Sequence, residues 1–540
     1  MQKQIFHFYQ KCFWQIFIIT SIVFSFYLIT FFFGNHDFLY LKFGTKVFQG
    51  LEEGRLTQFI PQKLLFDNQI LPILSASLGL LFFCLTPIIL TKAWHIKQKT
   101  TIIIFSLLLT LNPQILSQAY YVHQITSILL WHLFIALGLY ILLLPTRTYQ
   151  NYILTHILWT ISICGYAPTI TTILVITTSS IIIDILQNNL TLKQIIQKYL
   201  PIYLIALLSA TTYFAILKTL KFNNLFENSM YNTQVLSIKD IIFKIAQNYK
   251  LPFKVLFFQT PYEVPFAKFF ILILLLLCIA LAYIQKRIAI ISPLLIITIL
   301  SAGIPSFISP HNTFYFFRIN FFSIPYIIAI LFIITHTSKN LIIKNFSLIC
   351  SVIILFNFIK ADFITQKIWH LGNKQDELAT ERLRTNLFPQ IDLRKKYRLY
   401  YIGEHNGRKK FANQSNYRSY KDIYREYYDY EYLICPFFTS GLFLTENHNP
   451  IYGSMLYYIA PQFTHLITNN EYLNNKEKEL YEPFAFTLPK TSQMKEIYNW
   501  LTSSNRSKTL VFDEDIFIYI SPNYTHYLSI MYYLEFIKQN

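Results

Sequence analysis

The chain has 540 residues, of which 54% are hydrophobic and only 14% are charged; this composition excludes a string of soluble domains and indicates a polytopic membrane protein. The formal net charge of +18 does not call for a nucleic acid partner, because lysines and arginines in short cytoplasmic loops orient membrane helices and no zinc spacing or RNA-binding signature accompanies them. Five of the six cysteines fall in apolar runs, so Cys435, the single cysteine of the polar tail, cannot form a disulfide within that tail.

Eleven apolar runs come before residue 360, each about long enough to cross a hydrocarbon core of roughly 30 Å. They predict membrane helices near residues 12–33, 70–91, 100–117, 125–144, 152–166, 168–187, 200–218, 266–284, 288–306, 320–336 and 345–360. The sequence from Gly165 to Pro168 leaves open whether the fifth and sixth runs form two helices or one kinked helix. No cleavage pattern of a signal peptide follows the first run, so it is predicted to remain as a membrane helix.

The basic residues between these helices predict how the chain crosses the membrane. Lys3, Lys92, Arg147 and Lys198 all fall in segments on the same side, and the positive-inside tendency makes that side the cytoplasm. With an odd number of helices the N-terminus is cytoplasmic, and both the first loop and the polar tail lie outside. Merging the two helices around Pro168 would break this agreement, which favours two helices.

Beyond residue 360 charged residues and tyrosines become dense, and helix and strand patterns alternate. Residues Asp376 to Leu387 have the pattern of a charged helix. Strand patterns follow at residues 397–403, 509–512 and 516–520. This mixed order predicts a small α+β domain. The expected organisation is therefore a transmembrane domain at residues 1–360 and an extracytoplasmic C-terminal α+β domain at residues 361–540.

Four acidic residues lie in or beside the first external loop, and ionisable groups near a bilayer suggest a functional site. Asp37 is the leading candidate because it follows directly on the first membrane helix. A carboxylate within hydrogen-bond reach of an acceptor hydroxyl can take its proton as a general base. The alternative is that Asp37 caps the next helix or solvates the end of a loop.

Glu52, Glu53 and Asp67 compete with Asp37 for the role of base. A second carboxylate could also position acceptor hydroxyls or bind a divalent cation. Such a metal site needs several converging oxygen ligands, so a divalent metal is compatible with the sequence but not indicated by it. The alternative for Glu52 and Glu53 is the solvated polar face of an interfacial helix.

Arg55, Arg318 and His311 are the candidate phosphate ligands. A phosphate leaving group builds up negative charge, and the fork of an arginine matches phosphate oxygens in a bidentate manner. Arg318 opens a predicted helix on the outer side, where positive charge is not needed for topology. The alternative for Arg318 is an arginine that reaches toward lipid headgroups.

Several short motifs resemble one known family. They are Asn35-His36-Asp37 after the first helix, Gly54-Arg55, Asp67-Asn68 before Pro72, Asn112-Pro113 followed by Tyr120-Tyr121, and the later external Arg318. Together they resemble the Gtr-type, serotype-converting O-antigen glucosyltransferases, which belong to the wider class of polytopic GT-C glycosyltransferases. The resemblance covers roughly the first 145 residues and, more loosely, the region of Arg318.

The resemblance implies a polyprenyl-phosphate sugar donor that is used on the outer face of a bacterial inner membrane. Carried over by position, it implies Asp37 as the base, Gly54-Arg55 as the motif that shapes the loop, and Arg318 near the phosphate. The chain departs from the family where Phe38 follows Asp37, because a second acidic residue is often found there, and at Tyr166-Ala167, where Tyr-Gln is common.

The expected activity is transfer of a hexosyl group, by the resemblance a glucosyl group, from a polyprenyl-phosphate carrier to a cell-surface polysaccharide or lipid-linked glycan, with inversion. No Walker loop, Rossmann fingerprint, HExxH or Gly-x-Ser-x-Gly motif is present, which disfavours ATP-driven transport and zinc proteolysis. The alternative is a transporter or flippase of lipid-linked sugars. Such a protein should show charged or broken helices near the midplane, whereas the charges here gather at one face.

Overall fold

The structure, a computed structural model, describes residues 2–29, 55–69, 71–119, 122–188, 190–222, 238–257, 265–308, 322–390, 398–402, 508–512 and 515–519. Nearly all of these residues are helical. They divide into two compact units. The first unit holds the described residues up to Gln366, and the second holds those from Lys367 onward.

Each of the eleven predicted apolar runs overlaps a helix. These helices are α1 (Gln2–Val23), α5 (Pro72–Ala93), α6 (Lys99–Thr110), α8 (Val122–Leu142), α9 (Tyr149–Gly165), α10 (Thr169–Asn188), α11 (Leu192–Phe222), α14 (Pro265–Ile284), α15 (Ile288–Ser301), α18 (Ile324–His336) and α19 (Leu341–Leu387). Among the described residues, six segments are long and apolar enough to cross a membrane: Pro72–Ala93, Gln124–Leu142, Thr169–Asn188, Leu192–Leu220, Phe266–Ile284 and Leu341–Phe363. The helical membrane fold class is thereby confirmed, and the number of eleven crossings stays a prediction.

Short helices connect the long ones. They are α2 (Ser25–Ile29), α4 (Ile60–Phe66), α7 (Pro113–Ala119), α12 (Ile238–Asn248), α13 (Leu251–Phe257) and α16 (Ile304–Ile308), with a 3₁₀ turn at Phe388–Gln390. A proline stands first or second in four of them, at Pro61, Pro113, Pro252 and Pro305. At these positions the missing N–H costs nothing and the fixed φ favours helix initiation.

Residues 152–187, which fitted one or two helices in sequence, form two. Helix α9 ends at Gly165, and α10 begins at Thr169. The Tyr166 N–H donates to the Ser162 carbonyl at 2.9 Å, and the Thr169 N–H donates to the Tyr166 carbonyl at 2.9 Å. The intervening Pro168 has no N–H to continue the ladder, so the chain turns here and Tyr166 is placed at the end of the bundle.

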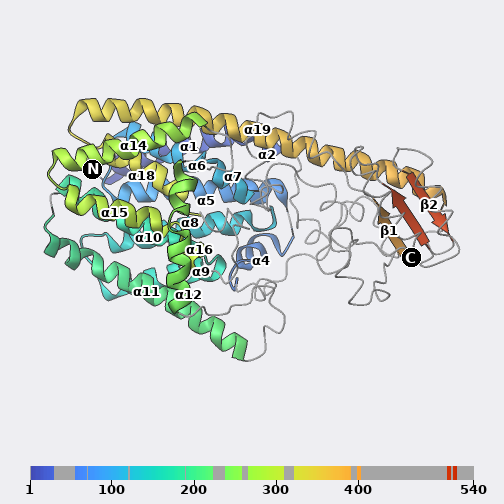
Figure 1. Cartoon of the computed structure of the whole chain (residues 1–540), viewed down its shortest axis with the longest axis horizontal. Coiled ribbons are helices and arrows are strands. Elements are labelled where there is room, and N and C mark those ends of the chain that lie inside the picture. Colours follow the sequence, from blue (N-terminus) through green and yellow to red (C-terminus); the bar gives the residue numbers. More distant parts are fainter. Residues whose placement is uncertain are drawn as a thin grey trace. The chain divides into compact units, whose positions relative to one another are not determined.

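The first unit is a bundle around two central elements. Helix α5 packs along α8, and α9 packs on the other side of α8. Every residue of α18 from Ile324 to His336 is buried, because α6, α10 and α14 pack against it. Figure 1 shows the long helices of this unit running side by side. A helix that is apolar all round and buried all round is expected only in the interior of such a bundle.

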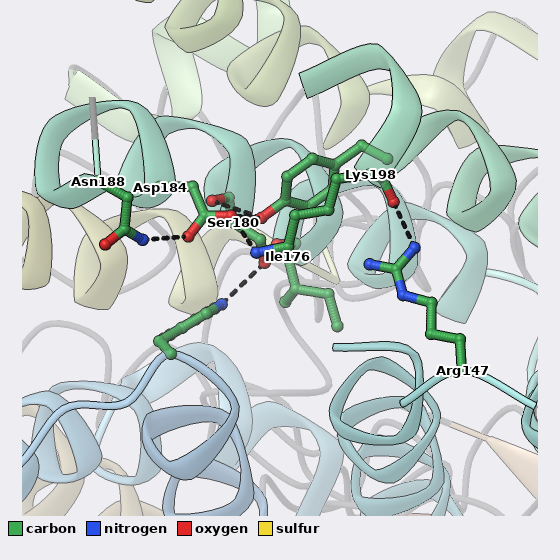
Figure 2. Close-up of polar contacts among 8 residues, drawn as sticks. Arg147, Ile176, Ser180, Asp184, Asn188 and Lys198 are labelled. Carbon is green, nitrogen blue, oxygen red and sulfur yellow. Dashed lines mark hydrogen bonds and ion pairs between the residues drawn. The ribbon is translucent and has the colours of Figure 1, made fainter. Parts of the chain in front are cut away.

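Basic residues and their partners gather at one end of this bundle. The Arg147 guanidinium donates to the Lys198 carbonyl at 2.7 Å, and the Lys198 ammonium forms an ion pair with Asp184 (Figure 2). The Asn188 amide donates to the same carboxylate at 3.0 Å, as does the Tyr199 hydroxyl at 2.6 Å. These contacts join the ends of α8, α10 and α11, and they bring together the loops whose charge predicts a cytoplasmic position.

The opposite end of the bundle is where α8 begins. Helix α8 has 21 residues, so its two ends are roughly 30 Å apart. Gln124 lies in its first turn, whereas Arg147 follows its last turn. Because α9 runs back antiparallel to α8, the turn at Tyr166 also lies at the Gln124 end. The predicted external segments therefore meet at the end away from the basic cluster.

Helix α12 carries exposed apolar side chains. Ile242 and Phe243 are each 61% exposed, whereas Lys244 is buried. The helix packs on α16, and Figure 1 shows α12 crossing the direction of the long helices. Exposed apolar side chains on a helix that lies across the bundle are expected of a segment in the plane of the membrane interface.

Helix α19 differs from the prediction, which ended a membrane helix near residue 360 and began another at Asp376. The structure has one helix of 47 residues, from Leu341 to Leu387. The reason is local: no proline falls between these residues, and straight-chain residues with good helix propensity fill the polar part. The change in polarity therefore marks no helix end.

The described residues of the second unit include the three predicted strands. They are β1 (Arg398–Ile402), β2 (Lys508–Phe512) and β3 (Asp515–Tyr519), in the sheet order β1-β3-β2. Strands β1 and β3 are parallel, with Tyr400 opposite Phe517, and β2 and β3 are antiparallel, with Leu510 opposite Phe517. The division at residues 360 and 361 and the α+β domain itself stay predictions, because most residues of the tail lie outside the described part.

Candidate active site

Arg55 is at the centre of a polar cluster at the Gln124 end of the bundle. One guanidinium nitrogen donates to the Gln58 side-chain oxygen at 3.3 Å and to the Gln124 side-chain oxygen at 3.4 Å. The Gln58 amide in turn donates to Gln124. Gln58 and Gln124 are buried, whereas Arg55 is only half-buried. The two amides therefore hold the guanidinium in place while part of it remains accessible.

An aromatic ring also contacts the guanidinium. The Arg55 carbon Cζ lies 5.5 Å from the centre of the Tyr166 ring, a distance at which a cation and an aromatic face attract each other. Tyr166 is itself buried in the break between α9 and α10. The turn before Pro168 thus places one of the rings that contact Arg55.

Two backbone contacts tie the segment of Arg55 to the end of α9. The Thr57 N–H donates to the Cys164 carbonyl at 3.3 Å, and the Thr57 hydroxyl donates to the Ile161 carbonyl at 2.8 Å. The approach requires a glycine next to Cys164: a Cβ at position 165 would lie 2.9 Å from the Thr57 hydroxyl oxygen and 2.3 Å from the indole nitrogen of Trp131. Gly165 therefore allows Thr57, and with it Arg55, to lie this close to α9.

A column of aromatic rings continues from Tyr166 into the bundle. The ring centre of Tyr166 is 5.1 Å from that of Phe322, and Phe322 stacks on the imidazole of His132 at 4.4 Å. The Tyr326 hydroxyl is 2.7 Å from Nδ1 of His132. The column shows that Phe322, just before the start of α18, packs against Tyr166 next to the Arg55 cluster.

Asp67 is the one predicted carboxylate among the described residues. It ends α4 in a left-handed conformation with φ of 48°, which Asp and Asn tolerate better than other non-glycine residues. It forms an ion pair with Lys63, and its side chain is 84% exposed. The hydrogen bond from Lys63 and the charge of its ammonium lower the pKa of the Asp67 carboxyl. The described contacts of Asp67 are therefore those of a helix end.

Asn112, part of the motif Asn112-Pro113, also has a local structural role. Its side-chain oxygen accepts the Gln114 N–H at 3.0 Å, which caps the start of α7. Helix α7 then carries two further buried amide side chains, Gln114 and Gln118, toward α8. The motif thus shapes the wall of this end of the bundle.

Asp37, Glu52, Glu53, Arg318 and His311 lie outside the described residues. The same holds for the backbone of Tyr120 and Tyr121. Of the predicted candidates, the structure therefore describes Arg55 and Asp67, and it surrounds Arg55 alone with buried polar groups. In the described ranges, no three His, Cys, Asp or Glu side chains lie together as a metal site would require.

The sequence profile of a family described as Glucosyl transferase GtrII matches residues 11–336. The match covers more than half of the chain, from α1 to the end of α18, and it includes the whole Arg55 cluster. The chain belongs to the GtrII glucosyl transferase family. Family membership, together with the apolar helices, makes this protein a membrane glycosyltransferase. Comparisons with curated proteins and with solved structures gave no match.

Gln58 and Gln124 are site residues that the sequence did not reveal. Gln58 follows Arg55 by three residues, before the start of α4, and Gln124 lies in the first turn of an apolar helix. A glutamine close to the polar end of a membrane helix is common in any such protein. Only the fold brings the two amides together across 66 residues of sequence, so their role could not be read from spacing.

Proposed function

We propose that this GtrII family member transfers a glucosyl group from a polyprenyl-phosphate carrier to a cell-surface polysaccharide or lipid-linked glycan at the outer face of the bacterial inner membrane. In this proposal the N-terminus is cytoplasmic, and the tail lies outside. The observation that carries the proposal is the Arg55 guanidinium, half-buried between two amides and the Tyr166 ring at the end of the bundle opposite the basic cluster. A guanidinium in such a place suits a phosphate at the membrane surface.

Chain connectivity limits how far two of the other candidates, Glu53 and Arg318, can lie from described residues of the Arg55 cluster. Glu53 comes two residues before Arg55, so their Cα atoms are at most about 7 Å apart. Arg318 comes four residues before Phe322, which limits that separation to about 14 Å, and Phe322 packs on Tyr166 beneath Arg55. These limits support a second arginine and one or two carboxylates at the same mouth. His311 and Glu52 stay secondary candidates there.

The proposed reaction is a single displacement at the anomeric carbon. Asp37 takes the proton of the acceptor hydroxyl, and the oxygen attacks the anomeric carbon on the face opposite the phosphate. The bond between the anomeric carbon and the phosphate oxygen breaks, and its electron pair leaves with the polyprenyl phosphate. Arg55 and Arg318 stabilise the charge that develops on that phosphate. Attack from the opposite face inverts the anomeric centre. Glu52, Glu53 or Asp67 would position further acceptor hydroxyls.

A flippase of lipid-linked sugars is the second candidate, because it also would bind phosphate. The family match favours the transferase, since the family is one of glucosyl transferases. The described ion pairs, Lys198–Asp184 and Lys63–Asp67, both lie at helix ends rather than within the apolar part of a helix. A transport pathway is expected to have ionisable groups near the midplane, and His132 is such a group, buried at the middle of α8, so the choice rests on the family match.

The test measures transfer of labelled glucose from polyprenyl-phosphate-glucose to envelope glycan in isolated membranes. We expect Asp37→Asn to lower the rate by about 100-fold or more, the usual effect of losing a general base. The matched control is Asp240→Asn, which removes an exposed carboxylate at the start of α12. It should leave the rate unchanged when both variants are expressed at the level of the unmodified chain.

Full activity of Asp37→Asn would remove Asp37 from the role of base, and Glu52, Glu53 and Asp67 would then be replaced in turn. Absence of transfer by the unmodified chain would contradict the proposed donor. Other lipid-linked sugars would be tested next, followed by movement of a fluorescent lipid-linked sugar across proteoliposome membranes. The flippase function predicts such movement without any new glycosidic bond.

A further inference from the structure

The first membrane helix is interrupted at Phe24, between α1 and α2. In a continuous helix the Tyr27 N–H would donate to the Val23 carbonyl four residues earlier. Instead the Tyr27 N–H donates to the side-chain oxygen of Gln366 at 3.0 Å, and the Gln366 amide nitrogen donates to the Val23 carbonyl at 2.9 Å. The side chain of a residue on α19 has thus been inserted between the two backbone groups.

The sequence around Phe24 does not explain this interruption. Residues 20–29 contain neither proline nor glycine, which are the usual local causes of a kink. The chain is helical on both sides of Phe24, and the Phe24 N–H itself donates to the Thr20 carbonyl at 2.9 Å. A side chain that enters the hydrogen-bond ladder is the remaining established cause, and Gln366 is in that position.

Glutamine is well suited to this role. Its oxygen accepts one N–H, and its nitrogen donates to two carbonyls, that of Val23 and that of Asp362 at 3.2 Å. Gln366, Val23 and Tyr27 are all nearly fully buried, so each of these groups would lack a water molecule to replace its partner. A glutamate at position 366 would place a second acceptor oxygen against the carbonyls of Val23 and Asp362. A leucine there would offer no hydrogen-bond partner to these carbonyls or to the Tyr27 N–H.

The interruption lies at the same end of the bundle as Arg55. Tyr9, near the start of α1, bonds the Ile96 carbonyl at the basic end, whereas Thr20 bonds Thr110 at the far end of α6. Helix α2 follows the interruption, and the chain then continues toward Asp37, eight residues after Ile29. The interruption at Phe24 therefore sets the direction of α2, the last described helix before Asp37 in the chain.

We infer that Gln366 is a positioning residue that holds the first membrane helix broken at Phe24 and thereby aims the segment that leads to Asp37. The effect on transfer rests on the proposed function of Asp37, whereas the effect on the helix does not. Over the roughly 7.5 Å from Phe24 to Ile29 at the end of α2, a change of 20° in direction moves Ile29 by about 3 Å. A misplacement of only about 1 Å can lower a rate 100-fold.

The first arm of the experiment measures transfer by Gln366→Leu, which has a similar volume but cannot bond either backbone group. We expect kcat to fall at least tenfold with little change in the KM for the donor. The matched control is Asn357→Leu on the same helix, because the Asn357 amide donates to the Ile353 carbonyl of α19 itself at 2.8 Å. This control should keep its activity.

A second substitution distinguishes loss of the helix break from general damage to the fold. Proline at position 27 has no N–H and clashes with the carbonyl four residues earlier, so it imposes a break at the same place. Tyr27→Pro in the Gln366→Leu background should restore kcat to the level of the Tyr27→Ala single variant. Tyr27→Ala in the same background should not restore it. Equal activity of the two double variants would overturn the positioning role.

The second arm measures the helix directly, in a Cys435→Ser background, through the distance between spin labels. Ile29 follows the break, Trp14 precedes it, and Leu64 lies on α4; all three side chains are exposed. Gln366→Leu should shift the Ile29–Leu64 distance by about 3 Å, as estimated above, and leave the Trp14–Leu64 distance unchanged. Tyr27→Pro should reverse the shift.

An unchanged Ile29–Leu64 distance in Gln366→Leu would overturn the inference whatever the activity. A shifted distance with full transfer would show that the aim of α2 does not matter for the reaction, and the positioning role would be wrong. If the unmodified chain transfers no glucose, the proposed donor fails, and the distance measurements still decide whether Gln366 holds the break.

Discussion

Replacing Gly165 with alanine tests whether the close approach of Thr57 and Trp131 builds the Arg55 cluster. The new Cβ would lie 2.3 Å from the Trp131 indole nitrogen and 2.5 Å from its carbon Cε2, whereas non-bonded heavy atoms normally stay about 3.5 Å apart. The indole is nearly fully buried. It cannot move aside without displacing its neighbours.

The expected loss of stability follows from these distances. Overpacking of a buried site costs about 1–3 kcal/mol, and the better helix propensity of alanine returns at most about 1 kcal/mol. We therefore expect Gly165→Ala to lower the free energy of unfolding by about 1–2 kcal/mol. The third contact, 2.9 Å to the Thr57 hydroxyl, would also push Arg55 away from its position, so transfer should fall by tenfold or more.

A thiol-reactive dye in a thermal ramp measures this stability, because the five cysteines of the described ranges are all buried. The matched control is Gly79→Ala in α5. Its new Cβ would lie 3.2 Å from the end of the flexible Leu129 side chain, so its melting temperature should hardly change. Trp131→Phe should restore part of the loss in Gly165→Ala, since the smaller ring lacks the colliding nitrogen, and the described contacts give that nitrogen no hydrogen-bond partner.

A melting temperature and a transfer rate of Gly165→Ala equal to those of Gly79→Ala would contradict the predicted collision at position 165. So would a Trp131→Phe substitution that lowers the stability of Gly165→Ala by as much as it lowers that of the unmodified chain. Additive effects would mean that positions 165 and 131 are not in contact.

Three further predictions concern charged side chains. Arg55→Lys should lower kcat/KM for the polyprenyl donor tenfold to 100-fold, because an ammonium cannot replace the planar fork of a guanidinium; an unchanged value in the membrane transfer assay would remove Arg55 from the phosphate site. Asp184→Asn should lower the free energy of unfolding by about 1–3 kcal/mol, since it takes a charged partner from Lys198 and Tyr199, while transfer at low temperature stays normal; the thiol dye measures the loss, and equal melting would contradict it. Lys63 lowers the pKa of Asp67, so the small contribution of this ion pair to stability is present at neutral pH and is lost as the pH falls through the lowered pKa, below about 4; solvent screening of so exposed a pair makes that contribution too small to measure. Because Asp67 is exposed, Asp67→Asn should leave melting at pH 7 unchanged, and loss of transfer by this variant would instead give Asp67 a role in the reaction.

The positions of the helices could be predicted because long apolar runs have few alternatives in a membrane. The break before Pro168 illustrates this: the ring removes an N–H and the preceding residues turn, so two helices follow from local chemistry. The positions of strands β1 and β3 could also be predicted from local sequence, because the alternation of side chains is a property of each segment alone.

The contacts of the candidate site could not be predicted from local sequence, because they join residues that are far apart in the chain. Arg55 was a candidate because its charge stands out in an apolar chain, whereas Gln58 and Gln124 gain their meaning only from the fold. Asp67 was a candidate for the same reason as Arg55, its charge in an apolar chain, but the structure gives it the contacts of a helix end. A sequence identifies which side chains could carry chemistry, but burial and partners decide which of them are surrounded by a site.

Gln366 was missed for a related reason. It lies beyond residue 360, where the rise in charge marked the expected end of the transmembrane domain, and nothing in its neighbours sets it apart. Helix α19 carries the amide past that point because no helix-breaking residue intervenes. The partners of the amide, Val23 and Tyr27, are more than 330 residues away in sequence.

That separation has a consequence for the order of events during synthesis. The first membrane helix is made before the residue that interrupts it, and at about 5–20 residues per second the ribosome needs roughly 17–70 s to reach residue 366. Until then α1 and α2 are free to form one continuous helix. We expect the direction of α2 to be fixed only when α19 packs against the first membrane helix. Incomplete chains should therefore remain inactive even though they contain every candidate catalytic residue. Full transfer by a chain that ends before Gln366 would contradict this expectation.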